Sequence, residues 1–464
     1  MTYPPNVRPA PERAPERQPV PPAVPVPPQH SARTLVTERL RAAATTEPGR
    51  LQIIGAVLAL LVVAFGAVTA FEINDRAAAA NDVVERSQPL SAKAADIYRS
   101  LADADAAAAS GFLAGPQEPR DVHDQYVKDI DDASRLLVEA AATTDSSTRS
   151  GQEITKLNEE LPRYTGLIER ARANNRQGLP LGGAYLRYAN QKMANELLPA
   201  AERLYTAETD RLDQDYRSAR TWPYLSLAAG VVALAVLFWV QRRNYRRTNR
   251  VFNHGLLAAT AAATVVLLWL AVGHTVSRSD LAEADAHGQR SLDVLNRARI
   301  DSLKARANEN LTVVARGAVL TADGKNDKYE TDYGTGMKAL GEELARAGKL
   351  ADGDAPGSEP VAAAVSAVGE WQSRHRTARK ADDDGDYEAA LELIIGSKGS
   401  TGESFKQVDD ALHKAITHEQ AEFTEAAKDG RGALGGLPIG AAALAVVGAV
   451  AAIVGINRRL SEFR

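Results

Sequence analysis

The chain contains no cysteine among its 464 residues, and only 5% of its residues are aromatic. The lack of cysteine excludes disulfides, thiolate metal ligands and thiol nucleophiles. The sequence also lacks a phosphate-binding P-loop, a dinucleotide-binding glycine motif and a serine-hydrolase elbow. We therefore expect a non-enzymatic protein that needs no cofactor or metal, and we expect no nucleic-acid partner.

Four apolar stretches contain no Asp, Glu, Lys or Arg and reach the length of about 20 residues that crosses a bilayer. They cover residues 51–71, 222–240, 251–273 and 434–456. Aromatic rings such as Trp239 lie near their ends, as at membrane interfaces. The sequence predicts four transmembrane helices. The alternatives are buried core helices and, for the first stretch, a cleaved signal peptide.

Basic residues around these stretches predict the orientation of the chain. The segment 241–250 contains no acid and five arginines, which are Arg242, Arg243, Arg246, Arg247 and Arg250. The positive-inside rule places this loop in the cytoplasm, together with the tail 1–50 and the terminus 457–464. Segments 72–221 and 274–433 then lie outside, and we expect a multi-pass cell-membrane protein with both termini cytoplasmic. The five arginines mainly fix the topology and are candidate contacts for acidic lipids or a cytoplasmic partner.

The N-terminal tail has eleven prolines in its first 28 residues. This composition predicts a disordered, partly extended spacer, with a ligand for a proline-binding groove as the alternative.

The chain also shows an internal repeat with an offset of 202 residues. Residues 71–115 align without a gap to 273–317, so that Arg76 falls on Arg278. The predicted unit consists of a span, a helical domain and a second span.

Glycine, proline and short polar residues divide each long segment into four helices. The predicted helices are 72–113, 119–143, 147–176 and 183–221, followed by 274–322, 326–349, 358–382 and 385–430. The last of them is expected to be interrupted at Gly396 to Gly402. Four antiparallel helices whose first and last members enter the membrane form an up-down bundle. Abundant alanine also favours helices. The predicted fold is all-α, with two tandem modules that each comprise a span, an extracytoplasmic four-helix bundle and a span.

Possible metal-binding patterns do not match known motifs. The acidic stretch 382–386 lacks the spacing of an EF-hand loop, and it reads better as a helix start with Asp386 near the N-cap. His413 and His418 are five residues apart, without the pattern of a metalloprotease helix. Trp371 and His375 share one helix face, which indicates a packed ridge rather than a ligand pocket. The spans contain no ionisable residue except a histidine near one edge, which argues against a transporter.

A module of span, four-helix domain and span resembles the input module of bacterial chemoreceptors and sensor kinases. With two modules and no output domain, the chain resembles the GlnX-type membrane proteins of actinobacteria. The residues that carry this resemblance are the proline-rich tail, the arginine-rich loop, and the stretches 385–390 and 458–464.

This resemblance implies a signal-transduction protein that connects an amino-acid-binding lipoprotein outside to serine/threonine protein kinase G inside. Two other functions stay open: a direct small-molecule sensor of the chemoreceptor type, and a structural scaffold of the cell envelope. Membrane lipids are expected partners, and a homo-oligomer is left open.

Overall fold

The computed structural model describes residues 47–248 and 253–461, so the proline-rich tail lies outside the described residues. Within the described ranges all regular elements are helices, and extended pairing is limited to one bridge between Leu320 and Asp327. This confirms the predicted all-α fold. We call residues 47–248 the first module and residues 253–461 the second module.

The first module contains long helices that are joined in part by π-helical turns, labelled η. Its elements are α2 (Glu47–Asp82), η1 (Val83–Ser87), α3 (Gln88–Leu113), α4 (Arg120–Thr143), α5 (Arg149–Arg176), α6 (Leu181–Lys192), η2 (Met193–Leu197), α7 (Leu198–Arg220) and α8 (Tyr224–Thr248).

The second module follows the same general order. Its elements are α9 (His254–Glu283), η3 (Ala284–Gln289), α10 (Arg290–Ala315), α11 (Lys328–Leu350), α12 (Ala355–Asp383), α13 (Tyr387–Ile395), α14 (Thr401–Ala433) and α15 (Leu437–Ser461).

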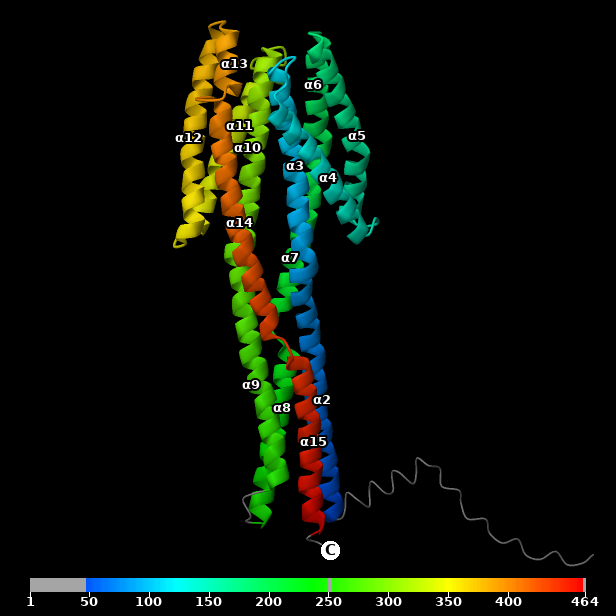
Figure 1. Cartoon of the computed structure of the whole chain (residues 1–464). Helices are drawn as coiled ribbons and strands as arrows, with labels where there is room; N and C mark the ends of the chain where they lie inside the picture. Colours follow the sequence, from blue (N-terminus) through cyan, green and yellow to red (C-terminus); the bar gives the residue numbers. More distant parts are fainter. Residues whose placement is uncertain (1–46, 249–252, 462–464) are drawn as a thin grey trace, which may run out of the picture.

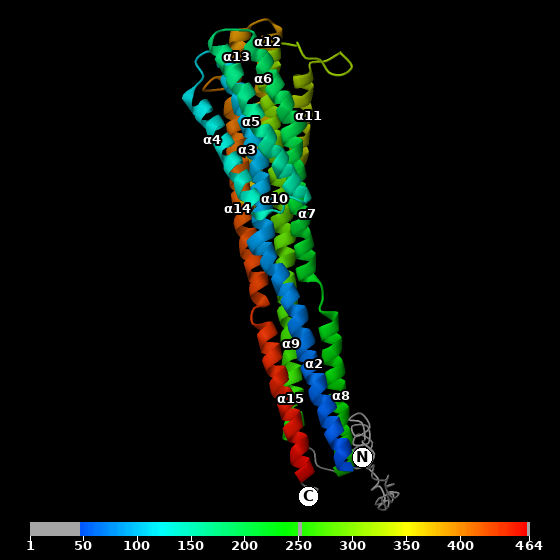
Figure 2. The ribbon, with the colours of Figure 1, turned by 90° about the vertical axis from the view of Figure 1, so that its right-hand side faces the viewer.

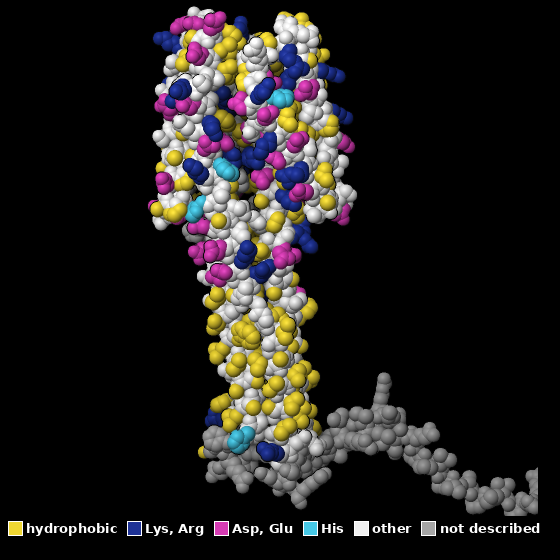
Figure 3. All heavy atoms as spheres, in the orientation of Figure 1, with side chains coloured by type: hydrophobic (Ala, Val, Ile, Leu, Met, Phe, Trp, Pro, Cys, Tyr) yellow, Lys and Arg dark blue, Asp and Glu magenta, His cyan; other side chains and the backbone are white. Residues whose placement is uncertain are grey.

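The molecule is elongated, with a narrow helical stalk below a wider head (Figures 1 and 2). The stalk is formed by α2, α8, α9 and α15, and the head by α3–α7 and α10–α14. Four helices in the described ranges are long and apolar enough to cross a membrane. Hydrophobic side chains cover the visible surface of the stalk, whereas charged side chains cluster on the head (Figure 3). The chain is therefore an all-α integral membrane protein.

Small residues allow the stalk helices to approach closely. The last helix, α15, packs along both α2 and α9. A Cβ atom added to Gly66 of α2 would lie 2.1 Å from the Cβ of Ala445, and one added to Gly440 would lie 2.3 Å from the ring of Trp269. Within a bilayer the hydrophobic effect does not drive helices together, so their association depends on close packing of small residues such as these. The stalk thus joins spans of both modules rather than forming two separate pairs.

The two halves of the head share an interface. Helices α5 and α6 of the first module and α12 of the second lie on the outside of the head. Helices α3 and α10 lie side by side at its centre (Figure 1). The hydrophobic core of the first module also includes Ile300, Leu303 and Leu311 of α10. The two bundles are therefore packed against each other through their entry helices.

One predicted helix is too long. The sequence predicts a helix that extends to residue 322, whereas α10 ends at Ala315. The following residues, Arg316 and Gly317, both have a positive φ, at 47° and 70°. This left-handed geometry ends the helix, as it commonly does at a C-terminus. Gly115, the equivalent of Gly317 in the proposed repeat, also has a positive φ, at 80°.

The modules have one continuous and one interrupted helix each between stalk and head. The entry helices run from α2 through η1 into α3, and from α9 through η3 into α10. The exit helices are broken, between α7 and α8 at residues 221–223 and between α14 and α15 at residues 434–436. Pro223 and the left-handed Gly436 (φ 72°) account for these two breaks.

Candidate functional site

One candidate site is a cavity of about 730 Å³ between the two modules. One wall is α7 of the first module, and the other is formed by η3, α10 and α11 of the second. Its size falls within the range of roughly 300–1,000 Å³ that small-molecule sites occupy. A ligand bound here would contact both modules at once.

Charged side chains of both signs line this cavity. The basic ones are Arg217, Arg220, Arg290, Arg346 and Lys349, and the acidic ones are Asp213, Asp285 and Asp293. Some of these charges already pair across the modules, because Arg220 Nη1 lies 2.8 Å from Asp285 Oδ2. The basic excess suits an anionic group, since arginine binds carboxylates and phosphates through two parallel hydrogen bonds.

A buried hydroxyl also faces this region. Tyr216 lines the cavity, and its Oη atom has no hydrogen-bond partner among the described residues. Buried polar groups are usually paired, so an unpaired one calls for an explanation. The hydroxyl itself is buried, so it lies behind the lining of the cavity rather than open to it.

The first break in the exit helices is held by arginines from both modules. Arg76 of α2 donates from Nε to the carbonyl oxygen of Thr221 at 2.7 Å and from Nη2 to that of Trp222 at 3.1 Å. Arg278 of α9 donates to the carbonyl oxygen of Arg220 at 3.2 Å, and its guanidinium lies 5.6 Å from the Trp222 ring centroid. The end of α7 is therefore fixed to both entry helices.

The second break is held by the first module. Arg431, in the last turn of α14, donates to Asn81 Oδ1 at 3.2 Å and to Glu85 Oε1 at 2.9 Å. These two acceptors lie in α2 and η1. Each break is thus tied to an entry helix of the other module.

A buried charged network lies in the core of the second bundle. Glu309 of α10 is fully buried and accepts hydrogen bonds from Trp371 Nε1 at 3.1 Å and from Arg306 Nη1 at 2.7 Å. It also lies 2.9 Å from Nδ1 of His375. Burial raises the pKa of Glu309, but the hydrogen bond from His375 and the charges of His375 and Arg306 outweigh burial and lower it. Glu309 is therefore ionised, and it ties α10 to α12.

The first bundle has a similar buried centre. Asp105 of α3 accepts a hydrogen bond from Tyr164 Oη at 3.1 Å and one from Asn190 Nδ2 at 2.6 Å. In both bundles a buried carboxylate on the entry helix therefore bonds an aromatic side chain of the third helix. These centres fix the alignment of the helices, and Asp105 and Asn190 also line a small cavity of about 260 Å³.

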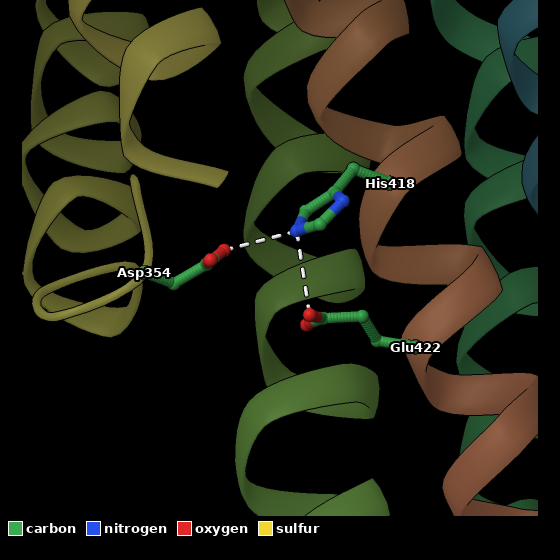
Figure 4. A group of neighbouring side chains, drawn as sticks. All are labelled: Asp354, His418 and Glu422. Atoms are coloured by element: carbon green, nitrogen blue, oxygen red, sulfur yellow. Dashed lines mark hydrogen bonds and ion pairs between the residues drawn. The ribbon is translucent and has the colours of Figure 1, made fainter. Parts of the chain in front are cut away.

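A third cluster brings together Asp354, His418 and Glu422 at the stalk-side end of α12 (Figure 4). Asp354 precedes α12 and caps it, because Oδ2 accepts a hydrogen bond from the Gly357 amide at 2.8 Å. His418 and Glu422 lie one turn apart on α14. The three residues offer one imidazole and two carboxylates to a single point.

The arginines predicted as partner contacts lie at the end of α8. Arg242, Arg243, Arg246 and Arg247 belong to this helix, and the Arg243 guanidinium lies 5.4 Å from the Trp239 ring centroid. Arg250 lies outside the described residues. Their role as lipid or partner contacts stays a prediction.

Two interpretations of local sequence patterns are confirmed. Trp371 and His375 are buried, and both pack against Tyr333, whose ring stacks on that of His375 at 3.8 Å. They form the predicted packed ridge. Asp386 is the N-cap of α13 and accepts from the Ala389 amide at 3.1 Å.

Sequence reasoning missed the inter-module cavity and the Asp354 cluster. Asp354 is separated from His418 by 64 residues, and Arg220 from Asp285 by 65. The available signals were an N-cap aspartate and a helical His-to-Glu spacing of four residues. Neither signal shows that the two helices meet.

The fold and these sites define a helical membrane protein whose charged head is coupled to four spans. Residues 79–217, from the end of α2 to the end of α7, match the family described as the actinobacterial sensor domain. This match supports a sensor protein from actinobacteria, and it covers less than a third of the chain. No curated protein and no solved structure matches the chain.

Proposed function

We propose that this protein is a non-enzymatic transmembrane sensor that converts binding at its head into movement of its two exit spans, α8 and α15. One observation carries the proposal: Arg220 belongs both to the inter-module cavity and to the first helix break. Its guanidinium pairs with Asp285 in the cavity wall, while its carbonyl oxygen accepts a hydrogen bond from Arg278. A change in the cavity therefore acts directly on the junction between α7 and α8.

The interrupted helices supply the moving part in this proposal. A packed interface tends to switch between discrete arrangements, and hinges are commonly short segments at the ends of helices. The continuous entry helices act as the fixed frame, and α8 and α15 shift against them. Movement of α8 repositions the arginine-rich loop 241–250, which on the positive-inside rule faces the cytoplasm.

We further propose that the head lies outside the cytoplasm and that the signal reports amino-acid supply. The GlnX-type resemblance supports delivery of this signal by a solute-binding lipoprotein and its receipt by a cytoplasmic Ser/Thr kinase. The second candidate is direct binding of a small solute, as in chemoreceptors. The charged cavity of about 730 Å³ favours this candidate.

The absence of cysteine makes a direct test of movement practical. Single cysteines at Tyr245 of α8 and Val454 of α15, both exposed, would carry spin labels in the full-length protein in nanodiscs. The distance between the labels would be measured with and without amino acids, and with and without the candidate lipoprotein. We expect a ligand to change this distance.

Two matched arginine variants test whether the hydrogen bonds at the first break transmit the movement. Arg76→Ala removes the hydrogen bonds to the first break, whereas Arg86→Ala removes only an exposed ion pair with Asp82. We expect the distance change to disappear in Arg76→Ala and to persist in Arg86→Ala. A ligand that binds without moving the labels in the wild-type protein would refute the transmission mechanism. Co-purification from native membranes tests association with the lipoprotein and with the kinase separately. If neither co-purifies, direct binding of a small solute is the candidate that stays.

A further inference from the structure

Three metal-ligating side chains from two separate elements meet at one point in the second module. Asp354 lies between α11 and α12, and His418 and Glu422 lie on α14 (Figure 4). One potential ligand atom from each residue lies within 4.8 Å of the others. All three side chains are partly exposed, at 35%, 26% and 51%.

One of the two distances at His418 Nε2 matches that between two ligands of one cation, and the other is a hydrogen bond that would have to lengthen. His418 Nε2 lies 2.9 Å from Asp354 Oδ2 and 3.4 Å from Glu422 Oε1. Two ligands on a tetrahedral zinc ion, with bonds of about 2.0–2.2 Å, lie about 3.3–3.5 Å apart. A single ring nitrogen also carries at most one proton, so His418 cannot donate a full hydrogen bond to both carboxylates. Small side-chain rotations would bring all three atoms to one ion.

The cap that Asp354 provides does not compete with this role. Its Oδ2 atom accepts the hydrogen bond from Gly357, but a carboxylate has about four acceptor positions on its two oxygens. Asp354 therefore caps α12 and retains the capacity to bind a cation.

The ligand set selects the type of metal. Magnesium and calcium prefer sites made of oxygen ligands alone. One imidazole and two carboxylates are a set that zinc accepts, and partial exposure leaves a fourth position for water. Metal binding would require the neutral imidazole and would release any proton on Nε2.

The surrounding surface attracts cations. Glu422 also lines a neighbouring cavity of about 310 Å³ that contains acidic and no basic side chains. The other acidic residues in its wall are Asp280, Glu283, Glu425 and Asp429. A cleft with charges of one sign raises the local concentration of the opposite ion.

We propose that Asp354, His418 and Glu422 bind a divalent transition-metal cation of the zinc class. The ion joins the start of α12 to α14, the helix that leads to the second break. This site departs from the expectation of a protein without metal, and it is independent of the proposed function of the inter-module cavity.

The test is zinc titration of the full-length protein, with any affinity tag removed and after treatment with a chelator. Nanodiscs of neutral lipid keep lipid headgroups from binding the metal. Isothermal titration calorimetry should show one zinc ion per chain, and a tenfold excess of Mg²⁺ or Ca²⁺ should not displace it.

Three variants identify the ligands, and a fourth is the control. We expect His418→Ala to abolish binding, and Asp354→Asn and Glu422→Gln each to weaken it at least about tenfold. Asn is itself a good N-cap, so Asp354→Asn retains the start of α12. His413→Ala is the matched control, because His413 lies on the same helix and contacts Arg299 instead. Undiminished zinc binding in His418→Ala, or no stoichiometric binding in the wild-type protein, would overturn the proposal.

Discussion

Protonation of His375 should control the stability of the second bundle. Its Nδ1 atom lies 2.9 Å from Glu309 Oε1, and its Nε2 atom lies 3.1 Å from Glu330 Oε1. An imidazolium donates from both nitrogens, whereas a neutral imidazole donates from only one. Arg306 and Arg379 pair with the same two glutamates, at 2.7 and 3.4 Å, and Tyr333 stacks on the ring.

The pKa of His375 sets the pH range of this effect. Burial lowers the pKa, but hydrogen bonds to Glu309 and Glu330 and the charges of both glutamates outweigh it and raise the pKa to about 9. An unfolded histidine titrates near pH 6.5. The stabilisation is therefore present in full below about pH 6.5 and is lost as the pH rises through about 9. At about 1.4 kcal/mol per pH unit, the loss is of the order of 3 kcal/mol.

The measurement compares the unfolding free energy of the wild-type protein with that of His375→Gln between pH 6 and 10. The variant cannot gain a proton at this site, so the difference isolates His375 from other titrating groups. We expect the stability of the wild-type protein relative to the variant to fall by about 3 kcal/mol between pH 6 and pH 10. A difference that is constant or grows with pH would refute the reasoning.

Three further substitutions test other parts of the structure by thermal or denaturant unfolding. Gly66→Leu should destabilise the stalk by about 1–3 kcal/mol, because even a Cβ would collide with Ala445. Gly432→Leu is the control and should be tolerated, because a Cβ added to Gly432 meets no neighbouring atom within 4 Å. Tyr216→Phe removes an unpaired buried hydroxyl, so stability should be unchanged or rise slightly. Glu309→Ala leaves the buried Arg306 without its carboxylate partner and removes one of the two carboxylates that contact His375, so it should cost about 3–5 kcal/mol.

Much of the fold could be predicted because its signals are local. The length of the apolar stretches predicts the stalk helices, and residues such as Pro116 and Pro180 mark helix ends directly. The end of α10 was predicted too late because Val319 and Leu320 continue the apolar pattern past the true end. The break depends on a left-handed Arg316, a backbone conformation that no helix propensity reveals.

The π-helical turns and the sites could not be predicted in the same way. The turns η1 and η3 occupy nearly equivalent positions of the proposed repeat, at 83–87 and 284–289. Each places one extra residue in a helical turn, and such insertions depend on packing rather than on composition. The inter-module cavity depends on how two bundles meet, and each bundle's sequence describes only its own core.

The contacts at the helix breaks give a physical reason for two modules in one chain. Arg76 and Arg278 occupy equivalent positions of the proposed repeat, yet both reach the first break. The second break is instead held by Arg431 to Glu85 in the first module. A module on its own would lack one of the partners that hold its exit helix. These contacts therefore couple the two exit spans, because a shift of either bundle strains a break that is anchored in the other.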